Sequence, residues 1–159
     1  MSAIRMLALA GLFSLSFAAC SAARDNAAAE PVTEAVEVPI GGGIALAGTL
    51  HLPAPSDAPA PAVILYPGSQ ASTNLPGLAA HLAAQGIVAL DLNKRGVAGS
   101  GGHWRDETIE RQADDVLAAF AFLQTRAEVD AARIGVAGHS QGGWVAQLAA
   151  ARAPELGFV

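Results

Sequence analysis

The chain has 159 residues, of which 52% are apolar and 14% charged, a composition hydrophobic enough for one packed domain. Acidic residues outnumber basic residues by 14 to 9, and the formal charge of −5 excludes the basic surface that nucleic-acid binding requires. One cysteine and four histidines without zinc-ligand spacing exclude a structural zinc site and an internal disulfide.

The amino-terminal segment is typical of an export signal. Arg5 is followed by a run without charge up to residue 19, which matches a basic n-region and an apolar h-region. Residues 17–20, Phe-Ala-Ala-Cys, resemble the lipobox of bacterial lipoproteins, in which Cys20 becomes the lipidated first residue after cleavage. We therefore expect a signal peptide over residues 1–19, export to the bacterial periplasm or outer membrane, and attachment to the membrane through lipid chains.

Two alternatives stay open for this segment. An ordinary signal peptide could be cut after Ala19 or Ala23, leaving Cys20 as a free thiol. Alternatively, the uncharged residues from Met6 to Ala23, which are just long enough to span a bilayer, could remain as an uncut anchor. Residues 20–34 are polar, alanine-rich and without a period, which predicts a flexible tether.

Residues 35–159 alternate strand and helix signals. Two β-prone runs flank Gly41, Gly42 and Gly43 and predict an antiparallel hairpin, whereas the continuous apolar run at 62–66 predicts a strand buried on both faces. In chain order, the expected strands are 35–40, 44–52, 62–66, 87–92 and 133–137, and the expected helices are 75–85, 107–125 and 141–152. A hairpin followed by β-α-β-α-β-α predicts an α/β fold whose later strands are parallel.

Several side chains have expected positions in this fold. The helix at 107–125 repeats apolar residues at steps of three and four, and its solvent face is expected to carry Glu110, Arg111, Asp114 and Asp115. We expect Arg95 to be held by local carbonyl groups and by Asp91. We expect Trp104 and Trp144 in the core, and His51 and His81 at the surface.

Residues 138–142, Gly-His-Ser-Gln-Gly, match the pattern G-x-S-x-G between a predicted strand and a predicted helix. The two glycines are needed because side chains there would collide with the neighbouring strand and helix, and Gly143 is expected to let the helix pack closely. Ser140 would stand exposed at the carboxyl edge of the sheet, beside a helix N-terminus that favours an oxyanion. The pattern therefore predicts Ser140 as a nucleophile.

With these motifs the chain resembles the amino-terminal half of an α/β-hydrolase of the serine aminopeptidase-like and dienelactone hydrolase-like esterase and peptidase group. The similar segments, within residues 39–152, are the hairpin at 44–53, the strand and turn at 63–69, the glycine-rich loop at 91–102 and the elbow at 129–143. The resemblance implies that Ser140 is the catalytic nucleophile and that the backbone N–H groups of Gln141 and Ser69 form the oxyanion hole, with Gln70 as the second choice for Ser69. Pro67 stands where the family often has a histidine.

In this fold the acid and the histidine of the triad follow the serine, but residues 141–159 contain Glu155 and no histidine. We expect His139 to pack in the turn, and His103 as the base would break the family's order. The most economical interpretation is a fragment, truncated after the nucleophile helix, that carries the nucleophile half of the domain.

The expected function is an exported serine hydrolase of the esterase or peptidase type. It would act on a small ester or peptide through an acyl-enzyme at Ser140, with no metal or organic cofactor. The alternative is a non-catalytic exported binding or scaffold lipoprotein with an α/β-hydrolase-like half domain. That alternative is favoured by the missing acid and histidine if the chain is complete.

The lipidation hypothesis predicts that Cys20 carries the label when cells expressing the protein grow on a clickable palmitate analogue. Cys20→Ala should lose that label and move from the membrane fraction to the soluble fraction, because several acyl chains together make anchoring effectively stable. Equal labelling of both proteins would contradict the lipoprotein interpretation.

Overall fold

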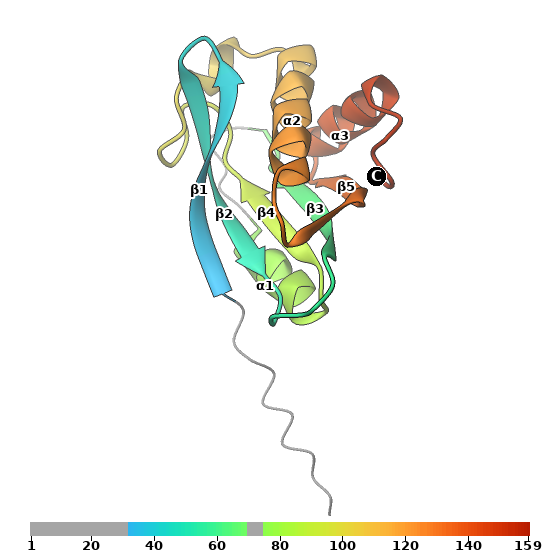
Figure 1. The fold of residues 1–159 in the computed structure, drawn as a ribbon. Helices are drawn as coiled ribbons and strands as arrows, with labels where there is room; N and C mark the ends of the chain where they lie inside the picture. Colours follow the sequence, from blue (N-terminus) through green and yellow to red (C-terminus); the bar gives the residue numbers. More distant parts are fainter. Residues whose placement is uncertain (1–31, 70–74) are drawn as a thin grey trace, which may run out of the picture.

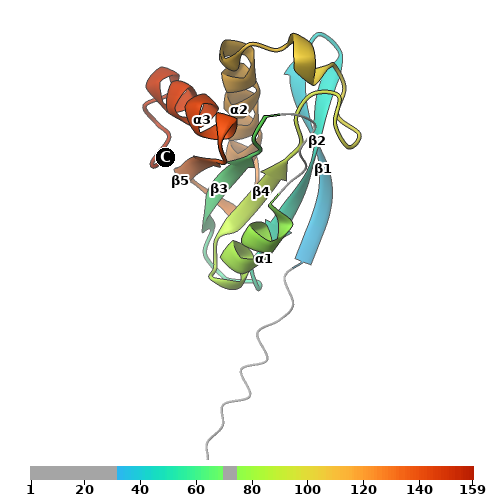
Figure 2. The ribbon, with the colours of Figure 1, turned by 180° about the vertical axis from the view of Figure 1, so that it is seen from behind.

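The computed structural model describes residues 32–69 and 75–159. In chain order the elements are β1 (Val32–Gly41), β2 (Ile44–Leu52), β3 (Ala60–Tyr66), α1 (Pro76–Ala84), β4 (Val88–Leu92), the short 3₁₀ helix η1 (Trp104–Asp106), α2 (Ile109–Gln124), β5 (Val129–Gly138) and α3 (Gln141–Arg152). The strands form one sheet in the order β1-β2-β4-β3-β5. Helices α2 and α3 cover one face of this sheet, and α1 covers the other (Figures 1 and 2).

The strand pairing has the predicted pattern. β1 and β2 form the antiparallel hairpin, β2 is also antiparallel to β4, and β3 is parallel to both β4 and β5. The predicted α/β fold is therefore confirmed. Two boundaries differ, because β1 begins at Val32, inside the segment expected to be a tether, and β5 begins at Val129, four residues earlier than expected.

The central strand β3 is buried on both faces, as its unbroken apolar run predicted. Ile64 and Tyr66 belong to the large core beneath α2 and α3. Val63 and Leu65 belong to the smaller core on the side of α1. Successive side chains of a strand point to opposite faces, so one short segment anchors both layers.

Helix α2 differs from the prediction in the width of its buried face. Glu110, Arg111 and Asp114 are exposed as expected, but Asp115 is fully buried, as is its neighbour Gln112. The apolar spacing alone placed Asp115 on the solvent face. It could not reveal that the glycine-rich loop covers this side of the helix and buries the carboxylate.

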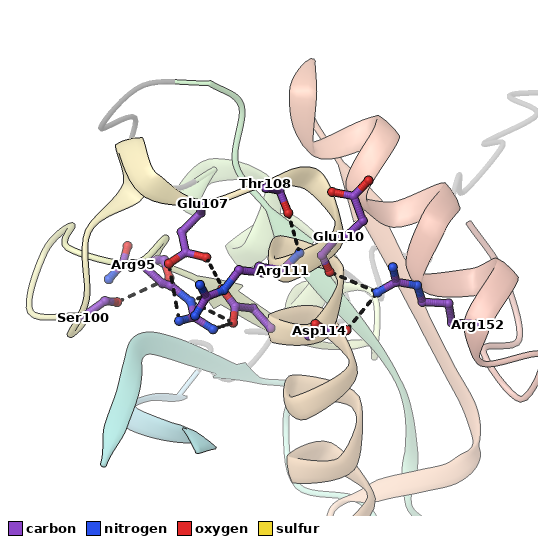
Figure 3. A network of polar contacts seen from close by, with 10 residues as sticks. Arg95, Ser100, Glu107, Thr108, Glu110, Arg111, Asp114 and Arg152 are labelled. Carbon is purple, nitrogen blue, oxygen red and sulfur yellow. Dashed lines mark hydrogen bonds and ion pairs between the residues drawn. The ribbon is translucent and has the colours of Figure 1, made fainter. Parts of the chain in front are cut away.

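The positive charge of Arg95 compensates the buried Asp115 carboxylate. The expectation that Asp91 would hold Arg95 is therefore wrong. Arg95 Nε donates to Asp115 Oδ2 at 2.9 Å and its terminal nitrogen donates to Oδ1 at 2.6 Å, while Glu107 lies 3.5 Å from the guanidinium on the other side. These hydrogen bonds raise the pKa of Arg95, which stays charged. Figure 3 shows Arg95, Glu107 and Arg111 in one network that ties the loop to α2.

The two tryptophans and two histidines with expected positions differ in their outcome. Trp144 is 68% exposed on α3, so its expected place in the core is wrong, and Trp104 is half-buried in η1. His81 is exposed as expected, but His51 is buried. β2 is paired on both sides, and this burial lowers the pKa of His51.

The predictions about the membrane fall on residues 1–34, most of which lie outside the described part of the chain. Within residues 32–69 and 75–159, no helix has both the length and the apolar character needed to cross a bilayer.

Adjacent aspartates of α2 offer a matched test of the buried ion pair. Asp115→Asn should lower the free energy of unfolding by about 3 kcal/mol, because it leaves the Arg95 charge buried with its main partner neutralised. Asp114, which pairs with Arg152 at the surface, is the control, and Asp114→Asn should change stability by less than about 1 kcal/mol. Urea unfolding of the three proteins measures both values, and equal effects would contradict this account.

Candidate active site

The carboxyl ends of three parallel strands meet at one edge of the sheet. The register pairs Leu65 of β3 with Asp91 of β4, and Tyr66 of β3 with Gly138 of β5. The segments that follow these strands therefore leave the sheet side by side. This edge is where open α/β sheets bind their ligands, and the predicted nucleophile, the predicted oxyanion turn and the glycine-rich loop all lie there.

The turn after β5 holds Ser140 in a strained conformation. Ser140 has φ +54° and ψ −117°, and among the described residues only Ala98 is another non-glycine residue with a positive φ. A side chain in this region costs on the order of 1–3 kcal/mol unless the surroundings impose the geometry. Ser140 is exposed at the N-terminus of α3, as the G-x-S-x-G pattern predicted.

Steric contacts explain two of the glycines around Ser140. A Cβ on Gly138 would overlap the backbone carbonyl of Gly142, and a Cβ on Gly142 would lie 2.5 Å from the Tyr66 carbonyl oxygen and 2.6 Å from the Pro67 oxygen. The predicted collisions with strand and helix are confirmed. The role expected for Gly143 is not, because a Cβ there would make only an ordinary contact, 3.6 Å from the Gly138 oxygen.

Backbone hydrogen bonds attach the turn to the end of β3. The His139 N–H donates to the Tyr66 carbonyl at 3.1 Å, and the Gly142 N–H donates to the His139 carbonyl at 2.9 Å. The His139 ring is exposed and borders Gly68, where a Cβ would lie 3.2 Å from Nδ1. His139 thus contributes mainly through its backbone.

The turn after β3 lies directly against the nucleophile. A Cβ on Gly68 would be 3.4 Å from the Ser140 Cβ, and Ser69, the predicted donor, follows Gly68 and is exposed. Gln141, the other predicted donor, is the first residue of α3. Gln70 and the lipid-attachment residue Cys20 lie outside the described residues. The structure therefore brings Ser69, Ser140 and Gln141 to one place.

Sequence reasoning missed Lys94, which connects these segments. Its side chain is buried, with 2% exposed, and Nζ donates to the Gly68 carbonyl at 2.9 Å and to Gln141 Oε1 at 2.8 Å. Burial lowers the pKa of Lys94. A signal was present, because Lys94 is the only lysine in the chain and follows the end of a predicted buried strand by two residues.

The described residues do not place a base on the nucleophile. His103 caps η1, where its Nδ1 accepts the Arg105 N–H at 3.3 Å, and Glu155 is exposed. Within residues 32–69 and 75–159, no hydrogen bond joins the Ser140 hydroxyl to a histidine or a carboxylate. In the same ranges, no group of three or more His, Cys, Asp or Glu side chains is arranged to hold a metal ion.

The glycines of the turn give a second matched test. Gly138→Ala should lower the free energy of unfolding by about 3 kcal/mol or prevent folding, because its Cβ overlaps backbone that cannot move aside. Gly143→Ala should be neutral or stabilise by up to about 1 kcal/mol, because the contact is ordinary and alanine favours a helix. Thermal unfolding compares the two, and a stable Gly138→Ala protein would refute the steric account of the turn.

Comparisons with known proteins agree with this geometry. Residues 75–156, just over half of the chain, match the model of the prolyl oligopeptidase family. A search of curated protein sequences gave no match.

Solved structures with a similar fold also include hydrolases. The α/β hydrolase GrgF from Penicillium sp. sh18 is 27% identical, with a TM-score of 0.70, over 79% of this chain and 43% of that protein. A protein from Bacteroides ovatus assigned as a dipeptidyl aminopeptidase IV is 25% identical, with a TM-score of 0.66, over 79% of this chain and 20% of that protein. A dienelactone hydrolase from Anabaena variabilis, 24% identical with a TM-score of 0.65 over 79% and 60% of the two chains, shares the fold.

The chain thus spans less than half the length of the Penicillium hydrolase. The predicted resemblance to α/β-hydrolases is confirmed by the family match and by these structures. This chain belongs to the prolyl oligopeptidase family and has the α/β-hydrolase fold.

Proposed function

We propose that the protein is a serine hydrolase of the esterase or peptidase type with Ser140 as its nucleophile. The observation that carries the proposal is the strained, exposed position of Ser140 at the N-terminus of α3, against Gly68. Strained backbone persists only where the surroundings impose it, and it concentrates at functional sites. The helix N-terminus adds unpaired N–H groups and a partial positive charge.

In the proposed reaction, Ser140 Oγ attacks the carbonyl carbon of the substrate while its proton passes to a base. The carbonyl oxygen becomes an oxyanion that accepts hydrogen bonds from the N–H groups of Gln141 and Ser69. Collapse of this intermediate breaks the bond to the leaving alcohol or amine, which takes up the proton, and leaves an acyl-enzyme. Water then attacks the acyl carbon by the same route and regenerates the Ser140 hydroxyl.

The proposed substrate is a small ester or peptide. Support comes from the prolyl oligopeptidase family match and from a similar protein assigned as a dipeptidyl aminopeptidase. The proposed location is the bacterial cell envelope, with Cys20 as the lipid attachment that holds the protein at a membrane. The sequence of residues 1–20 supports this part of the proposal.

One observation favours a second candidate function, that of a non-catalytic exported binding or scaffold protein. Among the described residues, no histidine or carboxylate is hydrogen-bonded to the Ser140 hydroxyl. The experiment that follows therefore tests for the base as well as for the nucleophile.

A fluorophosphonate probe reacts with a serine only when a base activates it, so it separates the two candidates. The whole gene product should be labelled at Ser140, and Ser140→Ala should remove both labelling and ester or aminoacyl hydrolysis, a loss of about 10⁶-fold in kcat. Ser69→Ala should change kcat far less, because its proposed role belongs to the backbone. Peptide mapping by mass spectrometry identifies the labelled residue.

The same probe applied to the 159-residue chain alone should label it weakly. Strong labelling would mean that a base lies within these residues, and His103→Ala should then abolish it. An unlabelled whole gene product with intact folding would refute the hydrolase proposal and favour the scaffold protein.

A further inference from the structure

We propose that Lys94 is a positioning residue that orients both N–H donors of the oxyanion hole. The inference rests on the proposed function, in which Ser140 is the nucleophile. It adds a residue that does not itself touch the substrate.

The first argument is the geometry of one peptide group. The Gly68 carbonyl and the Ser69 N–H belong to the same planar trans peptide, in which the two groups point in opposite directions. Lys94 Nζ holds the Gly68 oxygen at 2.9 Å from the buried side. This hydrogen bond therefore directs the Ser69 N–H away from the buried side, toward the exposed edge of the sheet where Ser140 stands.

The second argument is that the same ammonium group reaches the other donor residue. Lys94 Nζ donates to Gln141 Oε1 at 2.8 Å, so the side chain of Gln141 is fixed at the point where its backbone opens α3. One nitrogen thus connects the turn after β3 to the turn after β5. Two short hydrogen bonds to a single atom hold the Gly68 carbonyl and the Gln141 side chain next to each other.

The third argument concerns charge. Lysine is almost never fully buried without an acidic partner, because removing an ammonium from water is costly. Among the described residues, Lys94 donates to two neutral groups, the Gly68 carbonyl and the Gln141 amide oxygen, and forms no salt bridge. A negative oxyanion formed at this edge would balance the ammonium charge.

The test compares Lys94→Met with the parent protein, using the whole gene product. Methionine is unbranched and similar in length but has no donor. We expect kcat for a small ester, and the rate of fluorophosphonate labelling at Ser140, to fall by about 10- to 100-fold, because a donor displaced by about 1 Å can cost about 10²-fold. KM should change less than about twofold, since the clamp acts in the transition state.

Gln141→Met is the second variant, and it keeps Lys94 in place in case Lys94→Met fails to fold. It should lower kcat by a smaller factor, because the Gly68 contact remains. The double variant should be no slower than Lys94→Met alone, because both changes remove the same hydrogen bond. Arg126→Met is the matched control, since it removes a cation that follows the C-terminal end of α2 and pairs with Glu34 and Glu128, and it should leave kcat unchanged.

Lys94 is the only lysine within residues 1–159, so in a protein labelled with ¹⁵N at lysine Nζ its signal is identified as the one that Lys94→Met removes. We expect this signal to be protected from hydrogen exchange and to shift when a boronic acid adds to Ser140, but not in Ser140→Ala. A merely structural lysine would not respond to the boronic acid.

The outcomes separate the two proposals. A parent protein that does not react with the probe refutes the proposed function. A reactive parent with unchanged kcat in Lys94→Met, a rise in KM alone, or an equal loss in Arg126→Met overturns the positioning role only. If Lys94→Met lowered kcat as completely as Ser140→Ala, Lys94 would be the proton acceptor, and this result too would overturn the positioning role.

Discussion

The packing of the turn after β5 against the end of β3 determines the rest of the site. A carbonyl of Tyr66 and a carbonyl of Pro67 lie where a side chain at residue 142 would be, so the first turn of α3 can approach β3 only with glycine there. The hydrogen bond from His139 to Tyr66 then fixes the distance. Since β3 is paired in parallel on both sides, the position of Ser140 relative to Gly68 is set by the sheet itself and not by a loop.

Two consecutive cationic residues, Lys94 and Arg95, follow β4 and contact different parts of the structure. Lys94 reaches toward the turns of the site, and Arg95 reaches toward Asp115 of α2. A buried ion pair of this kind often contributes little to net stability compared with apolar residues of similar size. Here the ion pair fixes a position. Because Arg95 is bound to Asp115 of α2, the neighbouring backbone of Lys94 is held close to Gly68 and Gln141.

Elements and residues with a local signal could be predicted from the sequence, whereas pairs distant in the chain could not. The unbroken apolar run of β3 and the G-x-S-x-G pattern each encode their own local structure, a doubly buried strand and a strained turn before a helix, and both structures are observed. Asp115 was assigned to solvent because helical periodicity describes one helix and does not report that a loop twenty residues earlier covers it. Lys94 was missed for the same reason, since its partners lie 26 and 47 residues away.

Two energetically unfavourable features meet at the same edge of the sheet. The positive φ of Ser140 would be relieved by glycine, and the buried ammonium of Lys94 would be relieved by an apolar side chain. The two features come from different strands, yet Lys94 contacts the residue that follows Ser140. Stability alone would place neither feature there. The proposed reaction creates negative charge next to Ser140, where both features would act, and this is the physical reason to treat them as one site.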